Sequence, residues 1–284
     1  MPDSKDQIIQ NIEQAVADQA FHRKVEVNDP VVDRKQIAQD IQNYLRLRQT
    51  SGYKVKTLMA TKAADWAAPV INRRTDIIGL DKIKGLNQAG IITSNHFNPL
   101  ENTAVRLAIH KAGYKKMAIV SQITNFEMTG MLGFFMKYSN TIPIADMYNY
   151  MGRDFPKLLK EQLDHGVPIL IYPEQEMWLN YRKPRMPQRG AYYYAAMFNV
   201  PIISFFIEII DLGKPERGSA SFNQVRYRLH VLDPVFPNAT LDVKHNSQAM
   251  MQTDYAQKKA AYEAAYHVPL DYTFAPSDIA GWRG

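Results

Sequence analysis

The chain has 284 residues, of which 46% are hydrophobic and 22% are charged, so it can bury a sizeable core and is not disordered by composition. Its 34 Lys and Arg residues exceed its 28 Asp and Glu residues, and the net charge of +6 suits anionic lipid, an acidic carrier protein, coenzyme A phosphates or nucleic acid. The absence of cysteine excludes disulfides, thiolate nucleophiles and cysteine-based zinc sites.

Residues 1 to 71 are predicted to form a helical N-terminal region. Apolar residues fall at helical spacing around Ile8 and Ile12, and again around Ile37 and Ile41. A third helix is expected over residues 57–71, where Pro69 should end or kink it. We therefore expect helices to precede the sheet domain.

Residues 72–284 are predicted to form an α/β domain that includes a C-terminal helix. After an opening segment at 77–79, strands are expected at 90–94, 117–121, 141–144, 167–172, 200–209 and 227–232. Helices are expected at 99–112, 155–165, 190–198 and 240–267. This alternation implies a mixed, largely parallel sheet flanked by helices on both faces.

No segment is long and apolar enough to cross a bilayer. The best run, residues 200–210, is about half of the ~20 apolar residues that a spanning helix needs. The first residues are polar and contain no apolar signal core. We therefore expect a cytoplasmic protein, which could still lie on a membrane surface.

The main candidate site is the segment from Asn95 to Glu101, with the sequence NHFNPLE. A strand is predicted to end just before His96, while Asn98 suits a helix N-cap and Pro99 the first helical position. Five residues along a regular helix rotate by about 140°, so His96 and Glu101 can meet only across such a turn. Glu101 would then hold one ring nitrogen of His96 and leave the other free as a general base.

A purely structural role is the alternative for the same residues. Asn98 and Glu101 also form an N-x-x-E capping box, in which Glu101 only caps the helix. The other six histidines have no spacing that suggests a metal site, so no metal is expected. The sequence also has no glycine-rich phosphate loop and no G-x-S-x-G motif.

In order and spacing, these segments resemble the glycerolipid acyltransferase superfamily, the lysophosphatidate acyltransferase group with its N-H-x4-D signature. The similarity covers roughly residues 72–210 and is carried by 77–81, 90–96, 133–144, 167–174, 189–191 and 200–203. It implies transfer of a fatty acyl group from acyl-CoA or acyl carrier protein to a hydroxyl of a lysophospholipid or another glycerolipid or glycolipid. No bound cofactor is expected. We expect His96 and Glu101 to be catalytic, and the substrate site to include Asn95, Asn98, Asp146, Glu174, Gln175 and Arg189.

The sequence departs from the family pattern in three places. Glu101 replaces the usual Asp, and Asp146 replaces a phosphate-binding Arg of the second motif. Residues 175–177 are Gln, Glu and Met where the third motif has Gly, Thr and Arg. Because a carboxylate at position 146 repels a phosphate monoester, simple lysophosphatidate is not the expected acceptor.

Two further groups of side chains have more than one interpretation. The positive charge that Asp146 does not supply at the second motif could come from one of five residues: Arg153, Arg182, Lys183, Arg185 or Arg189. Alternatively, these residues could form a solvated basic loop. Glu174 could shape the acceptor site, as the resemblance implies, or pair with a nearby Arg.

Three alternatives concern the function and the ligands of the chain. A non-catalytic lipid- or acyl-binding protein and a hydrolase both remain open, whereas nucleic acid is not expected because no RNA-binding signature is present.

An acceptor with a fatty tail resides in a bilayer, so we expect peripheral contact with an anionic membrane surface. The candidate contacts are residues 57–71, with Trp66 and flanking Lys and Arg, and residues 131–136, unless both pack into the core.

Overall fold

A seven-stranded sheet forms the centre of the protein in this computed structural model, which describes residues 4–27 and 33–284. The strands are β1 (Asp76–Ile78), β2 (Ile91–Thr93), β3 (Ala118–Gln122), β4 (Thr141–Ile144), β5 (Ile169–Leu170), β6 (Ile202–Pro215) and β7 (Asn223–Val231). Their order is β1-β7-β6-β2-β5-β3-β4, and only the β6–β7 pair is antiparallel. The predicted mixed, largely parallel sheet is confirmed.

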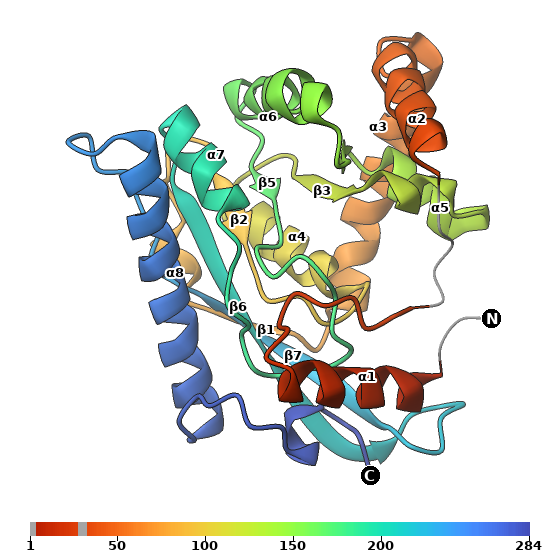
Figure 1. Ribbon diagram of the computed structural model, residues 1–284, viewed down its shortest axis with the longest axis vertical. Helices are drawn as coiled ribbons and strands as arrows, with labels where there is room; N and C mark the ends of the chain where they lie inside the picture. Colours follow the sequence, from red (N-terminus) through yellow and green to blue (C-terminus); the bar gives the residue numbers. More distant parts are fainter. Residues whose placement is uncertain (1–3, 28–32) are drawn as a thin grey trace.

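Helices cover both faces of this sheet (Figure 1). They are α1 (Lys5–Ala17), α2 (Arg34–Leu47), α3 (Ser51–Ile71), α4 (Glu101–Lys111), α5 (Gly130–Tyr138), α6 (Phe155–Asp164), α7 (Gly190–Phe198) and α8 (Val243–Tyr266). Shorter helical turns lie at Leu80–Lys82, Ile123–Glu127, Tyr150–Asp154 and Pro276–Asp278.

The central strands are buried on both sides because successive side chains point to opposite faces. Ile91 belongs to an apolar cluster with α2, α6 and α7, whereas its neighbour Ile92 belongs to a cluster with α4. Ile202 and Ile203 on β6 divide in the same way, in register with Ile91 and Ile92. This double burial explains why the central strands are continuous apolar runs in the sequence.

The N-terminal helices pack against three different parts of the sheet domain. α1 contributes to a buried cluster with Trp178, Phe222 and Ile279, whereas α2 adds Ile41 and Tyr44 to one of the sheet cores. α3 packs on α4 and α5. In Figure 1, α2, α3 and α5 gather at one end of the molecule, and α1 lies apart from them near β7. The proposed boundary between residues 71 and 72 stays a prediction.

Several element ends differ from expectation: α3 begins at Ser51 instead of residue 57, β6 extends to Pro215 instead of residue 209, and the start of α4 also differs. Asn98 is not the N-cap of the following helix, which begins at Glu101 instead of Pro99, with Leu100 before it. The Asn98 side chain accepts a hydrogen bond from the Leu100 N–H, and its carbonyl accepts one from the Glu101 N–H, so a separate turn occupies these residues. Pro69 lies in the last turn of α3, which ends two residues later at Ile71, as expected for a proline that ends a helix.

None of the helices in the described part of the chain is long and apolar enough to cross a membrane.

A buried ion pair fixes the C-terminal helix α8 to the sheet. Lys258 Nζ lies 2.8 Å from Asp254 Oδ2 and 2.9 Å from the hydroxyl of Thr93 on β2. Thr93 and Tyr192 both donate to Asp254 Oδ2, at 2.9 and 2.5 Å. Burial and the Asp254 charge together raise the pKa of Tyr192 well above its ordinary value, so this phenol remains a donor.

We predict that Lys258→Ala lowers the free energy of unfolding by about 3–5 kcal/mol, because it leaves the buried Asp254 carboxylate without its counter-charge. The neighbouring Lys259 is a matched control, since it forms an exposed pair with Glu263 on the same helix. Lys259→Ala should change the stability by less than about 0.5 kcal/mol. Equal destabilisation of the two variants in urea denaturation would contradict this account of α8.

Candidate active site

The candidate residues come from the carboxyl ends of parallel strands, which lie at one edge of the sheet. His96 follows β2, Glu174 follows the adjacent strand β5, and Asp146 follows β4. β4 is three strands away from β2, which corresponds to about 14 Å at the usual strand spacing. The fold therefore brings His96 and Glu174 together and places Asp146 further along the same edge.

His96 and Glu101 form the hydrogen-bonded pair that their spacing predicts. His96 Nδ1 bonds to Glu101 Oε1, and the Glu101 side chain is fully buried whereas that of His96 is 20% exposed. A carboxylate can only accept, so Nδ1 carries the proton in this pair and Nε2 is left with a free lone pair. The arrangement is that of a general base with an orienting carboxylate.

The second oxygen of Glu101 stabilises the backbone of the same turn. Oε2 accepts hydrogen bonds from the N–H of Phe97, at 2.8 Å, and from the N–H of Asn98. The bond to Asn98 is one half of the predicted capping box, but Asn98 caps Leu100 rather than Glu101. The orienting interpretation therefore corresponds to the contact of Oε1 with His96, and the capping interpretation to the contacts of Oε2 with the backbone.

An aromatic ring fixes the plane of the imidazole. Tyr172 stacks on His96 with ring centroids 3.9 Å apart and an interplanar angle of 11°. Burial and the charge of Glu101 raise the pKa of the Tyr172 hydroxyl well above its ordinary value, so the ring remains neutral. The sequence-based prediction missed Tyr172, although its place at the end of a predicted strand was a usable signal.

Glu174 binds the backbone of His96 and is paired with Arg185. Its Oε2 accepts from the His96 N–H at 3.2 Å and from Arg185 Nε at 3.1 Å, and its Oε1 accepts from the Arg185 N–H at 3.0 Å. Both side chains are buried, and burial lowers the pKa of Arg185 while the Glu174 charge acts in the opposite direction. The Glu–Arg pairing that was an alternative from the sequence is therefore present.

Gln175 has the left-handed backbone conformation that glycine adopts most easily, with φ at 65°. This is the position where the resembled family has Gly. A non-glycine side chain in this region costs about 1 kcal/mol. The Gln175 side chain is exposed at the edge of the site.

The other predicted site residues have different surroundings. Asn95 is buried, and its amide exchanges hydrogen bonds of 3.0 and 2.9 Å with the backbone of Ile207, so it joins the end of β2 to β6. Arg189 is exposed, next to Gln188, whose N–H donates to Pro173 O at 2.7 Å. Asp146 is also exposed. Binding of substrate by these residues stays a prediction.

Two of the five candidate basic residues are buried and paired instead of solvated. Lys183 is buried and lies 2.8 Å from Asp278, and Arg185 is buried against Glu174. Arg153 lies 3.0 Å from its neighbour Asp154. Among the five candidates, Arg189 is the one that is exposed and has no ion pair within the described residues.

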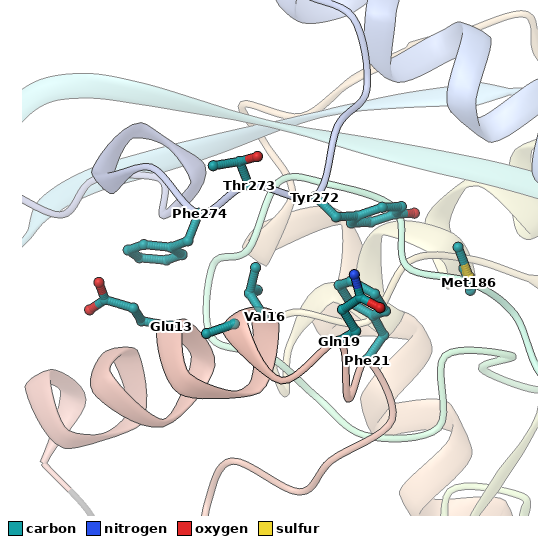
Figure 2. A pocket seen from close by; sticks show the side chains of 9 residues that line it. Glu13, Val16, Gln19, Phe21, Met186, Tyr272, Thr273 and Phe274 are labelled. Carbon is teal, nitrogen blue, oxygen red and sulfur yellow. The ribbon is translucent and has the colours of Figure 1, made fainter.

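A cavity of about 600 Å³ lies away from His96, between α1 and the C-terminal segment (Figure 2). Its lining residues are Glu13, Val16, Ala17, Gln19, Phe21, Met186, Tyr272, Thr273 and Phe274. The rings of Phe21 and Tyr272 pack against each other with centroids 4.5 Å apart. None of the residues of the His96 turn lines this cavity, so it is separate from the candidate active site.

With this geometry in place, comparison with known proteins identifies the class. Residues 74–208, a little under half of the chain, match the family model described as Acyltransferase, so this segment is similar to that family. The match includes His96, Glu101 and Glu174 and confirms the resemblance to the glycerolipid acyltransferases.

Among solved structures, the fold is similar to the crystal structure of the 1-acyl-sn-glycerophosphate (LPA) acyltransferase PlsC from Thermotoga maritima. The TM-score is 0.50 at 12% sequence identity, over 80% of this chain and 95% of that chain. At this identity the similarity concerns the fold alone. A search of curated proteins gives no match.

We predict that Glu101→Gln lowers kcat far more than Glu101→Asp does. Gln removes the charge that supports a protonated imidazole and turns an N–H group towards backbone donors, whereas Asp keeps the carboxylate that the family uses. The measurement is thiol release from an acyl thioester in the presence of lysolipid. If Glu101→Gln is fully active and only Glu101→Ala loses stability, the carboxylate is a helix cap and nothing more.

Proposed function

We propose that this protein transfers a fatty acyl group from a thioester donor, acyl-CoA or acyl carrier protein, to a hydroxyl of a lysophospholipid or another glycerolipid or glycolipid. The observation that carries the proposal is the His96–Glu101 pair at the end of β2, within the segment that is similar to the acyltransferase family. A binding protein needs no base, and the buried carboxylate behind the imidazole is what a base requires.

In the proposed reaction His96 Nε2 accepts the proton of the acceptor hydroxyl while the oxygen attacks the thioester carbonyl. The Glu101 carboxylate stabilises the imidazolium that forms, and α4, which begins at Glu101, directs the positive end of its dipole towards the developing oxyanion. Collapse of the tetrahedral intermediate breaks the C–S bond, and the imidazolium returns the proton to the thiolate. The products are an ester and a free thiol, and the enzyme ends in its starting state.

The acceptor in this proposal is not simple lysophosphatidate. Asp146 is an exposed carboxylate at the sheet edge, at the position where the resembled family has a phosphate-binding Arg. Of the candidate basic residues, Lys183 and Arg185 are buried and already paired with carboxylates, and Arg189 remains exposed. An uncharged or larger head group fits this balance of charge better than a phosphate monoester does.

The proposed membrane contact is a surface formed by α3 and α5. Its exposed apolar side chains include Trp66, which is 76% exposed, and Met131, which is 77% exposed. The others are Val55, Leu58, Met59, Val70, Ile71, Met128 and Leu132. Lys54, Lys56 and Lys62 lie on the same helix α3, and this combination suits an anionic interface. Leu100, also exposed, lies in the turn between His96 and Glu101, and α3 packs on α4, the helix that follows this turn.

We predict that the wild-type protein forms an ester only when a hydroxyl acceptor is present, and that His96→Ala lowers this rate by about 10²–10⁴-fold without loss of fold. Products from an acyl thioester and a panel of lysolipids and glycolipids are measured by mass spectrometry, with circular dichroism as the folding control.

The other outcomes separate the alternative functions. Release of free fatty acid at the same rate with and without acceptor identifies a hydrolase. Binding of acyl thioester without any product identifies a non-catalytic protein. Preferential acylation of lysophosphatidate over uncharged or larger lysolipids contradicts the proposed acceptor class.

We predict that the protein floats with anionic liposomes at low salt and is released at high salt, because screening weakens the attraction of its Lys and Arg residues to the surface. Trp66→Ala should weaken this binding. Phe236→Ala removes an exposed aromatic side chain from the connection between β7 and α8 and should have no effect. Equal binding to neutral and anionic vesicles, or no binding at low salt, would contradict the proposed contact of α3 with an anionic membrane.

A further inference from the structure

The backbone around His96 is held by the loop that follows β5, residues 174–185. The His96 N–H donates to Glu174, and the His96 carbonyl accepts from the Trp178 N–H at 3.1 Å. The next carbonyl, that of Phe97, accepts from the Asn180 N–H at 3.0 Å. The position of the imidazole therefore depends on this loop as well as on Glu101.

Arg185 is the residue that joins the parts of this loop. Its Nε donates to Glu174 Oε2 at 3.1 Å, and its Nη2 donates to the carbonyls of His96, at 3.4 Å, and Glu176. The guanidinium lies over the ring of Trp178, 4.5 Å from its centroid. A planar fork of donors can serve these partners at once, which a single ammonium cannot.

Arg185 also connects this loop to the N-terminal segment. Its Nη1 donates to the carbonyl of Phe21 at 2.9 Å, and Trp178 Nε1 donates to the carbonyl of Arg23 at 2.9 Å. Phe21 and Met186, the residue after Arg185, both line the cavity of Figure 2, where the two segments meet. This N-terminal segment lies outside residues 74–208, the part of the chain that matches the family.

We propose that Arg185 is a positioning residue for His96, and that through it the segment around Phe21 supports the catalytic turn. This inference rests on the proposed function of His96 as the base. Arg185 does not touch the imidazole or the reacting atoms. It acts by holding the Glu174 carboxylate and the His96 carbonyl in place, so that the ring keeps its contacts with Glu101 and Tyr172.

The test compares Arg185→Met and Arg185→Lys with the control Lys183→Met. Lys183 lies in the same loop, is also buried and is paired with Asp278, and its polar contacts among the described residues involve neither His96 nor Glu174. The first readout needs no substrate: the ring ¹H and ¹⁵N resonances of His96, assigned by their loss in His96→Ala. The second is kcat for thiol release, measured well below the unfolding midpoint of each variant.

Arg185→Met should shift the His96 ring resonances and lower kcat by about 100-fold, the size expected for a misplaced catalytic group. Arg185→Lys keeps the charge but not the fork, and should lower kcat by about 10-fold. Lys183→Met should lower the unfolding midpoint and leave the His96 resonances and kcat as in the wild type.

Wild-type resonances and kcat in a folded Arg185 variant would overturn the proposal, and so would equal effects in Lys183→Met. If Arg185→Met does not fold, Arg185→Lys decides. A failure of the proposed function itself is recognised separately, because His96→Ala would then have the same kcat as the wild type. The His96 resonances of the Arg185 variants would still report on the position of the ring.

Discussion

The candidate site depends on one buried carboxylate, that of Glu101, whose two oxygens bind a side chain and the backbone respectively. One oxygen of Glu101 holds His96 Nδ1, and the other accepts the N–H groups of Phe97 and Asn98. Any movement of the turn therefore moves the imidazole and its orienting group together. An unpaired buried carboxylate would be costly, so these three donors also explain why Glu101 can be fully buried.

The remainder of the structure keeps this turn in place from three directions. β2 leads into it from the centre of the sheet, with β5 and β6 on either side. Asn95 joins it to β6, and the 174–185 loop joins it to the region after β5. The chemistry proposed for His96 thus rests on a rigid edge of a parallel sheet, where side chains from several strand ends can converge on a ligand.

The sequence predicts what is local at this site, and little of what is distant. The His96–Glu101 pair spans five residues, so spacing and turn residues suffice to predict it. Asn98 is not the N-cap because its side chain accepts from the Leu100 N–H instead of the Glu101 N–H, a competition that propensities do not describe.

The distant contacts have no local signal. Arg185 bonds to Phe21, 164 positions away, and the sequence around it favours a solvated basic loop as readily as a buried ion pair. The central strands are predictable in type because both their faces are apolar, whereas their ends depend on tertiary pairing and differ from the predicted bounds, as where β6 extends to Pro215. The exposure of the apolar residues on α3 likewise depends on which face the core leaves uncovered, which periodicity alone does not decide.

The central claim is that His96 removes the proton of the acceptor hydroxyl, and its most direct test is the pH dependence of ester formation by the wild type and by His96→Ala. The account predicts that the wild-type rate falls towards acid pH with the slope of a single proton, because a protonated imidazole cannot act as a base. The small residual rate of His96→Ala should lack this dependence. If the variant follows the same pH curve as the wild type, the base lies elsewhere and the account is wrong.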